Sequence, residues 1–229
     1  MNRTGDAGFD AVLFDLDGTL VDTAPDMVAV LMDLQMSEGL EPLPYDLARS
    51  HVSNGAAGLI RLAFPDAPQA YRERLHAVYL ERYAASICVY SRLFPGLEAL
   101  LATLDTASCP WGVVTNKPDY LTRPLLDGLA LAERAACIVS GDTLPERKPH
   151  PAPLLLASDQ AGVPAERCVY IGDAARDIEA GRAARMGTIA AAYGYVTGDD
   201  DPVRWQADHI ATDTRELATI VQKAVNLQT

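Results

Sequence analysis

The sequence lacks a hydrophobic run long enough to cross a membrane, because no stretch approaches the roughly 18 consecutive apolar residues that a span requires. The opening segment, MNRTGDAGFD, has no apolar centre of the kind found in a secretory signal peptide. We therefore expect a cytoplasmic protein without a membrane partner. The 229 residues, 49% of them hydrophobic, predict one large core with room for a smaller insert.

Cysteine is also scarce, and its few positions are far apart with no CxxC pair among them. The four cysteines are Cys88, Cys109, Cys137 and Cys168. This spacing favours buried free thiols over disulfides or a thiolate metal site.

Positive charge is in short supply, and the net charge of -12 disfavours nucleic acid and anionic membrane surfaces as partners. Lysine is rarer than arginine, with three lysines against sixteen arginines. Two of the three, Lys117 and Lys148, lie beside the polar motifs described below. A compact ammonium group suits a phosphate ligand, although an ordinary surface lysine is the alternative interpretation.

Short apolar runs alternate with segments of helical spacing. The apolar runs lie at 11–14, 111–114, 138–139, 169–171 and 188–192. The helical segments lie at 97–104, 125–129, 154–157 and 178–186, the last closed by Gly187. This alternation predicts an α/β protein with a doubly wound, Rossmann-like, mostly parallel sheet, whose function gathers at the carboxyl ends of its strands.

Residues 22–90 interrupt this pattern because they show helical spacing and no convincing strand. We predict a core domain of residues 1–21 and 91–229 and a helical cap domain of residues 22–90. Such an insert would act as a lid that excludes water and selects the substrate.

Asp15 and Asp17 follow directly after the first apolar run, and Gly18 allows the chain to turn there. Two carboxylates placed in this way can reach one pocket. A DxDG sequence is also compatible with a calcium loop, but Asp26 stands where such a loop needs a glutamate. We therefore favour a catalytic pair over a calcium site.

Thr115 and Asn116 follow the second run of the series at 111–114 and offer a hydroxyl and backbone amides to a phosphate oxygen. An ordinary helix cap would explain them equally well. Lys148 precedes prolines that mark the start of another helix.

Asp173 follows the run at 169–171, and Asp177 lies four residues later. Carboxylates in this position suit a hard cation, and Mg²⁺ fits two or three of them together with water and a phosphate. For Asp177 alone, a favourable interaction with a helix N-terminus is the alternative.

The segments FDLDGTLVDT, VVTNKP, RKPHPAP and IGDAARD resemble, in order and spacing, the four motifs of the haloacid dehalogenase superfamily. The resemblance spans essentially the whole chain. It implies a Mg²⁺-dependent phosphatase that works through an aspartyl-phosphate, with Asp15 as nucleophile and Asp17 as general acid and base. Thr115 and Lys148 would hold the phosphate.

The same resemblance implies a metal site and a phosphate loop. The expected metal ligands are Asp15, Asp17, Asp173 and Asp177, and the expected substrate contacts in the core are Gly18, Thr19 and Asn116. Ala174 departs from the pattern, since many relatives have serine or aspartate there, which puts one contact behind the metal ligands in doubt.

Asp17 separates the reactions of this superfamily. The dehalogenating members lack an aspartate there, because a halide leaving group needs no proton. Phosphonate hydrolases use a cap lysine, and residues 22–90 contain none. A phosphomutase like β-phosphoglucomutase and a catalytically silent binding or regulatory relative remain as alternatives.

Within the superfamily, the chain is similar to phosphatases of 2-phosphoglycolate and of N-acetylmuramic acid 6-phosphate, and the tail from Tyr193 to Asp208 favours the sugar phosphate slightly. We expect a small phosphate ester as substrate and a monomer or homodimer. The predicted recognition loop of the cap comprises Arg49, His51, Ser53, Asn54 and Gly55, although solvent exposure alone would explain Arg49 and His51.

Overall fold

The computed structural model describes residues 8–198 and 200–226, and its centre is a six-stranded sheet with the order β5-β4-β1-β6-β7-β8. Every neighbouring pair runs parallel. The strands are β1 Ala11–Phe14, β4 Trp111–Val114, β5 Cys137–Val139, β6 Cys168–Gly172, β7 Gly187–Ala191 and β8 His209–Ala211. The predicted α/β fold is confirmed, and β1, the strand that directly precedes Asp15, lies in the middle of the sheet.

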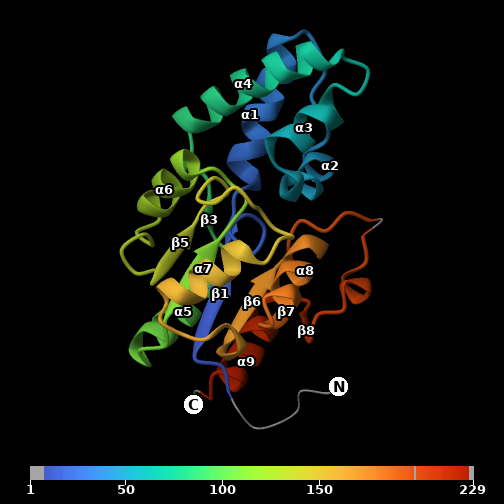
Figure 1. Cartoon of the computed structure of the whole chain (residues 1–229). Coiled ribbons are helices and arrows are strands. Elements are labelled where there is room, and N and C mark those ends of the chain that lie inside the picture. The colour runs from blue at the N-terminus through green and yellow to red at the C-terminus, as the bar shows by residue number, and fades with distance from the viewer. Residues whose placement is uncertain (1–7, 199, 227–229) are drawn as a thin grey trace.

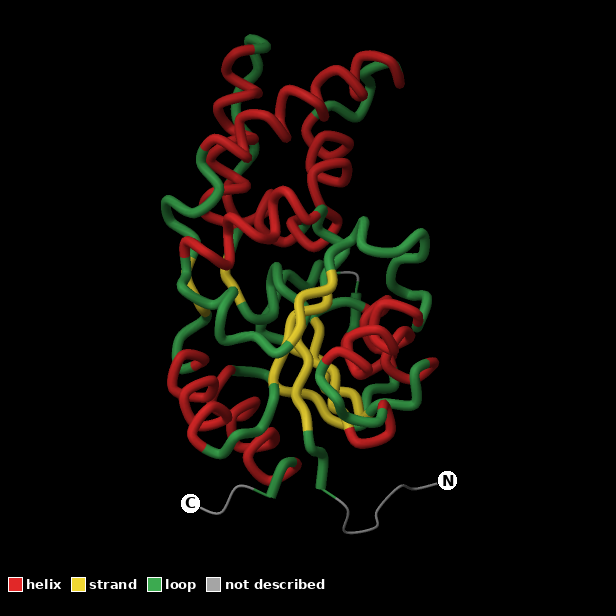
Figure 2. The backbone as a smooth tube through the Cα atoms, turned by 60° about the vertical axis from the view of Figure 1, so that its left-hand side comes forward, coloured by secondary structure: helices red, strands yellow, loops and turns green. Residues whose placement is uncertain are grey.

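Helices cover both faces of the sheet (Figure 2). Val12 and Phe14 of β1 pack in one core with α5, α6 and α9, whereas Ala11 and Leu13 pack in a second core with α7 and α8. Burial on both faces explains why β1 reads as a continuous apolar run rather than an alternating one. These helices are α5 Leu97–Thr106, α6 Asp119–Gly128, α7 Ala152–Gln160, α8 Ala175–Ala183 and α9 Thr214–Ala224.

The segment after the first strand is helical, as predicted, and stands above the carboxyl end of the sheet (Figure 1). It contains α1 Ala24–Ser37, α2 Tyr45–Ser50, the 3₁₀ turn η1 Val52–Asn54, α3 Gly55–Ala63 and α4 Gln69–Ala85. We call α1 to α4 with η1 the cap. At its two ends, β2 Val21–Asp22 pairs antiparallel with β3 Arg92–Leu93. The predicted bounds of 22–90 stay a prediction.

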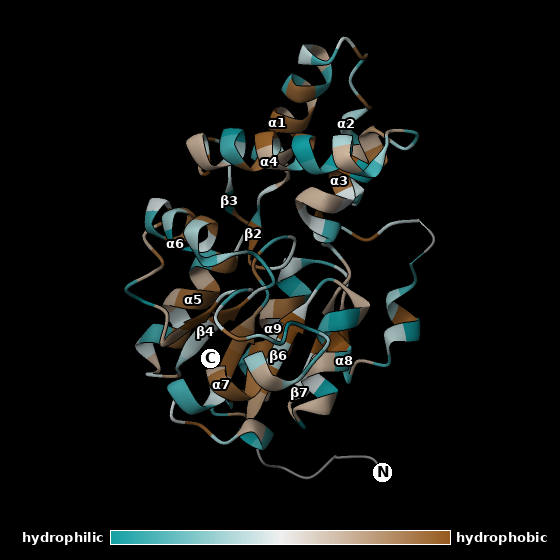
Figure 3. Ribbon diagram, turned by 45° about the horizontal axis from the view of Figure 1, so that its top comes forward, coloured by the Kyte–Doolittle hydropathy of each residue, from teal (hydrophilic) through white to brown (hydrophobic). Residues whose placement is uncertain are grey.

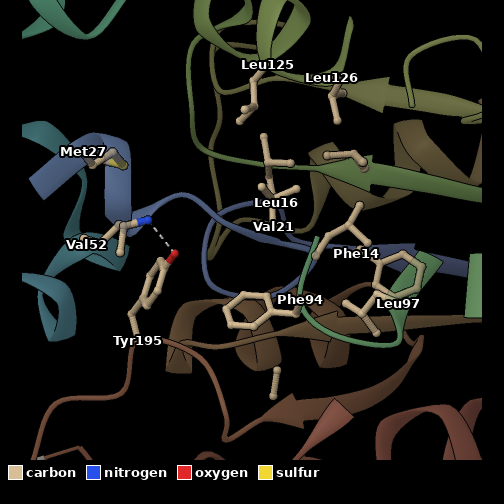
Figure 4. Close-up of a cluster of buried hydrophobic side chains, with 14 of the residues drawn as sticks. Phe14, Leu16, Val21, Met27, Val52, Phe94, Leu97, Leu125, Leu126 and Tyr195 are labelled. Carbon is tan, nitrogen blue, oxygen red and sulfur yellow. Dashed lines mark hydrogen bonds between the residues drawn. The ribbon is translucent and has the colours of Figure 1, made fainter. Parts of the chain in front are cut away.

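Tyr195, in the loop after β7, ties the sheet to the start of the cap. Its hydroxyl accepts a 2.8 Å hydrogen bond from the backbone N of Ala24 and donates a 2.7 Å one to Asp22. Figure 4 shows the ring in the apolar cluster that also contains Phe94, with the bond to Ala24 as a dashed line. The entry into the cap is thereby fixed to the core.

Several local features differ from the sequence expectations. The helix expected at 178–186 spans Ala175–Ala183, and Gly187 starts β7 instead of closing the helix. The last helix, α9, was not predicted; it begins where Asp213 accepts hydrogen bonds from the first free backbone amides. The short 3₁₀ turns η2 Ala165–Arg167 and η3 Pro202–Trp205 complete the connections.

Figure 3 shows the strands in hydrophobic colours and the outer helices in mixed ones, as expected for helices with one buried face. Among the described residues, no helix is long and apolar enough to span a bilayer. The cysteines are free, as predicted: Cys137 and Cys168 are buried, and Cys88 and Cys109 are half-buried.

Candidate active site

Asp15 and Asp17 leave the carboxyl end of β1, next to the ends of β4 and β6. The backbone N of Asp15 donates a 2.8 Å hydrogen bond to Ile171, so the first residue past the strand still follows the sheet. Gly18 then takes a positive φ of 82°, and a Cβ atom built there would lie 2.1 Å from Asp173 Oδ2. The glycine thus lets the loop of β1 approach the carboxylate of β6.

Three buried carboxylates meet at this edge of the sheet. Asp15, Asp173 and Asp177 each offer an oxygen within 4.8 Å of the others. Burial raises the pKa of Asp15 to about 6, against the opposing effect of Lys148. Burial also raises the pKa of Asp173 to about 7, and the charges of Asp15 and Asp177 add to that rise. Three such groups need nearby positive charge to stay ionised together.

Lys148 supplies part of that charge. Its Nζ lies 2.8 Å from an oxygen of Asp15 and 2.8 Å from one of Asp177, and it also donates to Val114 O and Tyr170 Oη. Burial alone would lower the pKa of this lysine, but the two carboxylates raise it. The side chain is therefore a fixed ammonium group beside the proposed nucleophile.

The acidic cluster fits a hard divalent cation. Asp173 Oδ1 is buried and has no hydrogen-bond partner among the described residues, while Oδ2 accepts from Ser53 and from the Tyr195 backbone. An unpartnered carboxylate oxygen in an all-oxygen site is the donor that such a cation needs. Asp177 differs, because Lys148 occupies one of its oxygens and the Ala174 amide the other. Asp177 therefore anchors the lysine in this structure.

Asp17 is half-buried and lies outside that cluster. Its Oδ1 accepts a 2.6 Å hydrogen bond from Thr23 and pairs with Lys117 Nζ at 2.8 Å. Lys117 also donates to the hydroxyl of Tyr83 on cap helix α4, at 2.9 Å. The scarcity of lysine beside the motifs suggested a phosphate contact for Lys117, whereas in this structure its ammonium pairs with Asp17. Asp17 therefore lines the cavity and is not part of the cluster of Asp15, Asp173 and Asp177.

Thr115 and Asn116 follow β4 as expected. Thr115 lines the cavity, and its hydroxyl accepts a hydrogen bond from the Lys117 backbone amide. The Asn116 side chain accepts a 3.1 Å hydrogen bond from the Lys148 backbone N and donates a 3.0 Å hydrogen bond to the Lys148 carbonyl. Asn116 therefore fixes the loop that carries Lys148. Gly18 and Thr19 were expected to contact the substrate, but they are not among the described residues that line the cavity.

The predicted recognition loop of the cap divides into two parts. Ser53 reaches the core. Its hydroxyl donates a 2.6 Å hydrogen bond to Asp173, and its backbone carbonyl accepts a 2.7 Å hydrogen bond from Arg176. His51, Asn54 and Gly55 line the cavity with it. Arg49 does not line it; it lies 3.7 Å from Asp22 and stacks 4.8 Å over the Tyr195 ring.

A cavity of about 820 Å³ lies between the cap and the core and takes in the proposed nucleophile. This volume is within the usual range for a small-molecule site, roughly 300–1,000 Å³. Sequence reasoning missed several of its lining residues, since only the packing of cap on core brings them there. These are Arg61, His76, Leu80, Tyr83, Arg147 and Arg176.

Comparison with known proteins agrees with the resemblance found in the sequence motifs. A family model for haloacid dehalogenase-like hydrolases matches residues 9–185. A phosphoglycolate phosphatase of Xanthomonas campestris pv. campestris (strain 8004) is 47% identical over 207 residues, covering 90% of this chain and 94% of the relative. The N-acetylmuramic acid 6-phosphate phosphatase of Pseudomonas aeruginosa is 42% identical over 218 residues, covering 94% and 96%.

The fold has solved counterparts as well. A crystal structure from Haemophilus somnus, described as a predicted phosphoglycolate phosphatase, superposes with a TM-score of 0.83 at 26% identity. The match covers 95% of this chain and 100% of that one. The likeness therefore includes the helical segment as well as the sheet.

Proposed function

This chain belongs to the haloacid dehalogenase-like hydrolase family, and we propose that it is a phosphatase that hydrolyses a small phosphate monoester through an aspartyl-phosphate on Asp15. The observation that carries the proposal is the contact of Asp15 with Lys148 at 2.8 Å, on the wall of a cavity large enough for an organic ester.

Asp15 is the proposed nucleophile. One of its oxygens attacks the phosphorus atom, the bond from phosphorus to the ester oxygen breaks, and the phosphoryl group remains on Asp15. Lys148 offsets the repulsion between the carboxylate and the phosphate dianion, and Thr115 offers its hydroxyl to a phosphoryl oxygen. Splitting the hydrolysis in this way replaces one difficult displacement with two easier ones.

Asp17 is the proposed general acid and base. In the first step it gives a proton to the departing alkoxide; in the second it takes one from the water that attacks phosphorus and releases inorganic phosphate. Such assistance typically contributes roughly a hundredfold to ten-thousandfold. Thr23 and Lys117 hold the carboxylate in place for both transfers.

We propose Mg²⁺ as the cation of the acidic cluster, held by Asp15 and Asp173 with Asp177 beside them. The ion, when bound, neutralises charge that develops on the phosphoryl oxygens. The unpartnered Oδ1 of Asp173 supports this assignment. The side chain of Asp17, also expected among the metal ligands, lies outside the cluster of Asp15, Asp173 and Asp177, so we assign Asp17 to proton transfer.

The proposed substrates are N-acetylmuramic acid 6-phosphate and 2-phosphoglycolate, the two compounds after which the relatives are named. The cavity volume of about 820 Å³ supports the larger sugar phosphate. A cytoplasmic location and a monomeric or dimeric state stay predictions.

The test is the release of inorganic phosphate from a panel of esters with and without Mg²⁺. We expect turnover only with the cation, no turnover by Asp15→Asn, and the highest kcat/KM for one of the two named esters. Absence of hydrolysis of every ester by the wild-type protein would favour a silent binding relative. Transfer of phosphate between two positions of a sugar, in place of its release, would favour a mutase.

A further inference from the structure

The charges on the cavity wall are unbalanced in a way that the phosphoryl group alone does not explain. Among the described residues, the acidic side chains that line the cavity are Asp15 and Asp17, and each already has a lysine ammonium at 2.8 Å. Arg61, Arg147 and Arg176 line the same cavity. In a chain with 31 acidic and 19 basic residues, this wall is cationic against the overall trend.

The three arginines differ in position. Arg176 donates to the Ser53 carbonyl beside the acidic cluster, and Arg147 precedes Lys148 in the core. Arg61 is on cap helix α3, about 9 Å along the helix from Gly55, given a rise of 1.5 Å per residue. It also lines a smaller hollow with Arg72 and Glu73, so it stands where the cavity opens outward. Arg61 is thus the one of these three arginines that lies in the cap.

Arg61 has no acceptor in the part of the chain that the structure describes: no carboxylate lies within ion-pair distance, and no hydrogen bond involves its guanidinium. His76 of α4 lines the cavity near it and is likewise without a hydrogen-bond partner there. The neighbouring Glu73 accepts from Gln69, and Arg72 donates to Pro65 O. Arg147 in the core also has no acceptor among the described residues, so Arg61 and His76 are the unpartnered side-chain donors that helices α3 and α4 contribute to the cavity.

We propose that Arg61, with His76 beside it, binds a carboxylate on the alcohol part of the substrate, which makes this enzyme selective for phosphate esters of hydroxy acids or sugar acids. The inference rests on the proposed phosphatase function and assigns the second anionic group of the substrate. A guanidinium presents two parallel N–H donors that match the two oxygens of a carboxylate. An ester without the acid leaves those donors to water and gains nothing from them.

The experiment compares kcat/KM of wild type and Arg61→Met on four esters. Two carry a carboxylate, 2-phosphoglycolate and N-acetylmuramic acid 6-phosphate; two do not, p-nitrophenyl phosphate and N-acetylglucosamine 6-phosphate, the same sugar phosphate without the acid group. We expect Arg61→Met to lower kcat/KM for one or both acids by about 10- to 100-fold, mainly through KM. For the two esters without a carboxylate, kcat/KM should change less than about twofold. Arg61→Lys should retain part of the kcat/KM for the acids that Arg61→Met loses.

Arg72→Met is the matched control, because it removes the same charge from the next helix outside the main cavity. This variant should leave kcat/KM unchanged for all four esters. If Arg61→Met loses kcat/KM only for N-acetylmuramic acid 6-phosphate, the site is built for a long substrate. If it loses kcat/KM only for 2-phosphoglycolate, the site is built for a short one. Either result supports the proposal. An equal effect of Arg61→Met on all four esters, no effect, or the selective loss appearing in Arg147→Met instead would overturn it. If wild type hydrolyses none of the esters, the proposed function itself fails.

Discussion

The hydroxyl of Ser53 donates a 2.6 Å hydrogen bond to Asp173 Oδ2, so the cap touches a carboxylate of the proposed cation site directly. This hydrogen bond lowers the pKa of Asp173, against the larger effect of burial. The predicted recognition loop and a proposed ligand of the cation are therefore linked by a single hydrogen bond. Closure of the cap and formation of the metal site are expected to depend on each other.

Ser53→Ala should weaken Mg²⁺ binding, because Asp173 loses the donor that orients it. Partners of this kind typically change metal affinity 10- to 100-fold, and we expect about tenfold. A titration of activity against Mg²⁺ concentration gives the value. Ser86→Ala is the control, since the Ser86 hydroxyl bonds to Arg82 O at the end of α4 and Ser86 does not line the cavity. An unchanged Mg²⁺ requirement in Ser53→Ala would contradict this link.

Gly18→Ala should disrupt the acidic cluster. The added Cβ would lie 2.1 Å from Asp173 Oδ2, and the backbone has φ +82°. Gly39→Ala is the matched control, because Gly39 has φ +74° but open space around it. Both variants should lose about 1–2 kcal/mol of unfolding free energy from the left-handed backbone, measured by denaturant titration. Only Gly18→Ala should also lose most of its activity; equal activity in the two would refute the close approach.

Asp17→Asn should separate the two chemical steps. The leaving group p-nitrophenolate needs no proton, so the variant should still transfer the phosphoryl group to Asp15. Hydrolysis of the aspartyl-phosphate then lacks its base, and steady-state turnover should fall by roughly a hundredfold to ten-thousandfold. Stopped-flow measurement should show a burst of about one nitrophenol per enzyme followed by slow release. A slow reaction without a burst would assign Asp17 to the first step alone.

The stability of the metal-free protein should fall as pH rises from about 4 to about 7. Asp15 and Asp173 have folded pKa values of about 6 and about 7, above the ordinary 3.8. The folded state therefore binds more protons than the unfolded chain in this window, and its advantage is lost as these protons leave. Mg²⁺ binds the deprotonated form, so it should raise Tm by a few degrees more at pH 7.5 than at pH 5. A Mg²⁺ effect on Tm that is the same at both pH values would contradict the prediction.

The central part of the fold could be predicted because its strands are buried on both faces. Runs such as Trp111–Val114 are apolar at every position and stop at a polar residue, so both the strand and its carboxyl end are visible in the sequence. The two-residue strands β2 and β3 and the three-residue β8, which begins with the exposed His209, carry too few apolar positions to be recognised. Their existence depends on pairing with distant segments.

The candidate site was predictable to a similar extent. Asp15, Asp173 and Asp177 come together because they follow adjacent strands or begin the helix after one. Contacts across the cap boundary were not predictable, since Lys117 meets Tyr83 and Arg49 meets Tyr195 only through tertiary packing. Arg49, expected in the recognition loop, is held by Asp22 and the Tyr195 ring instead. Arg61 gave no signal, because a single arginine on a helix is common on solvent-exposed faces.

The most direct test of the account is to locate the phosphoryl group on the protein. Asp17→Asn is mixed with Mg²⁺ and p-nitrophenyl phosphate, quenched in acid within the burst, digested and examined by mass spectrometry. The account predicts one phosphoryl group on the peptide that contains Asp15, and none when Mg²⁺ is omitted or Asp15 is also changed to Asn. A phosphoryl group on another residue, or steady turnover by the Asp15→Asn protein, would contradict it.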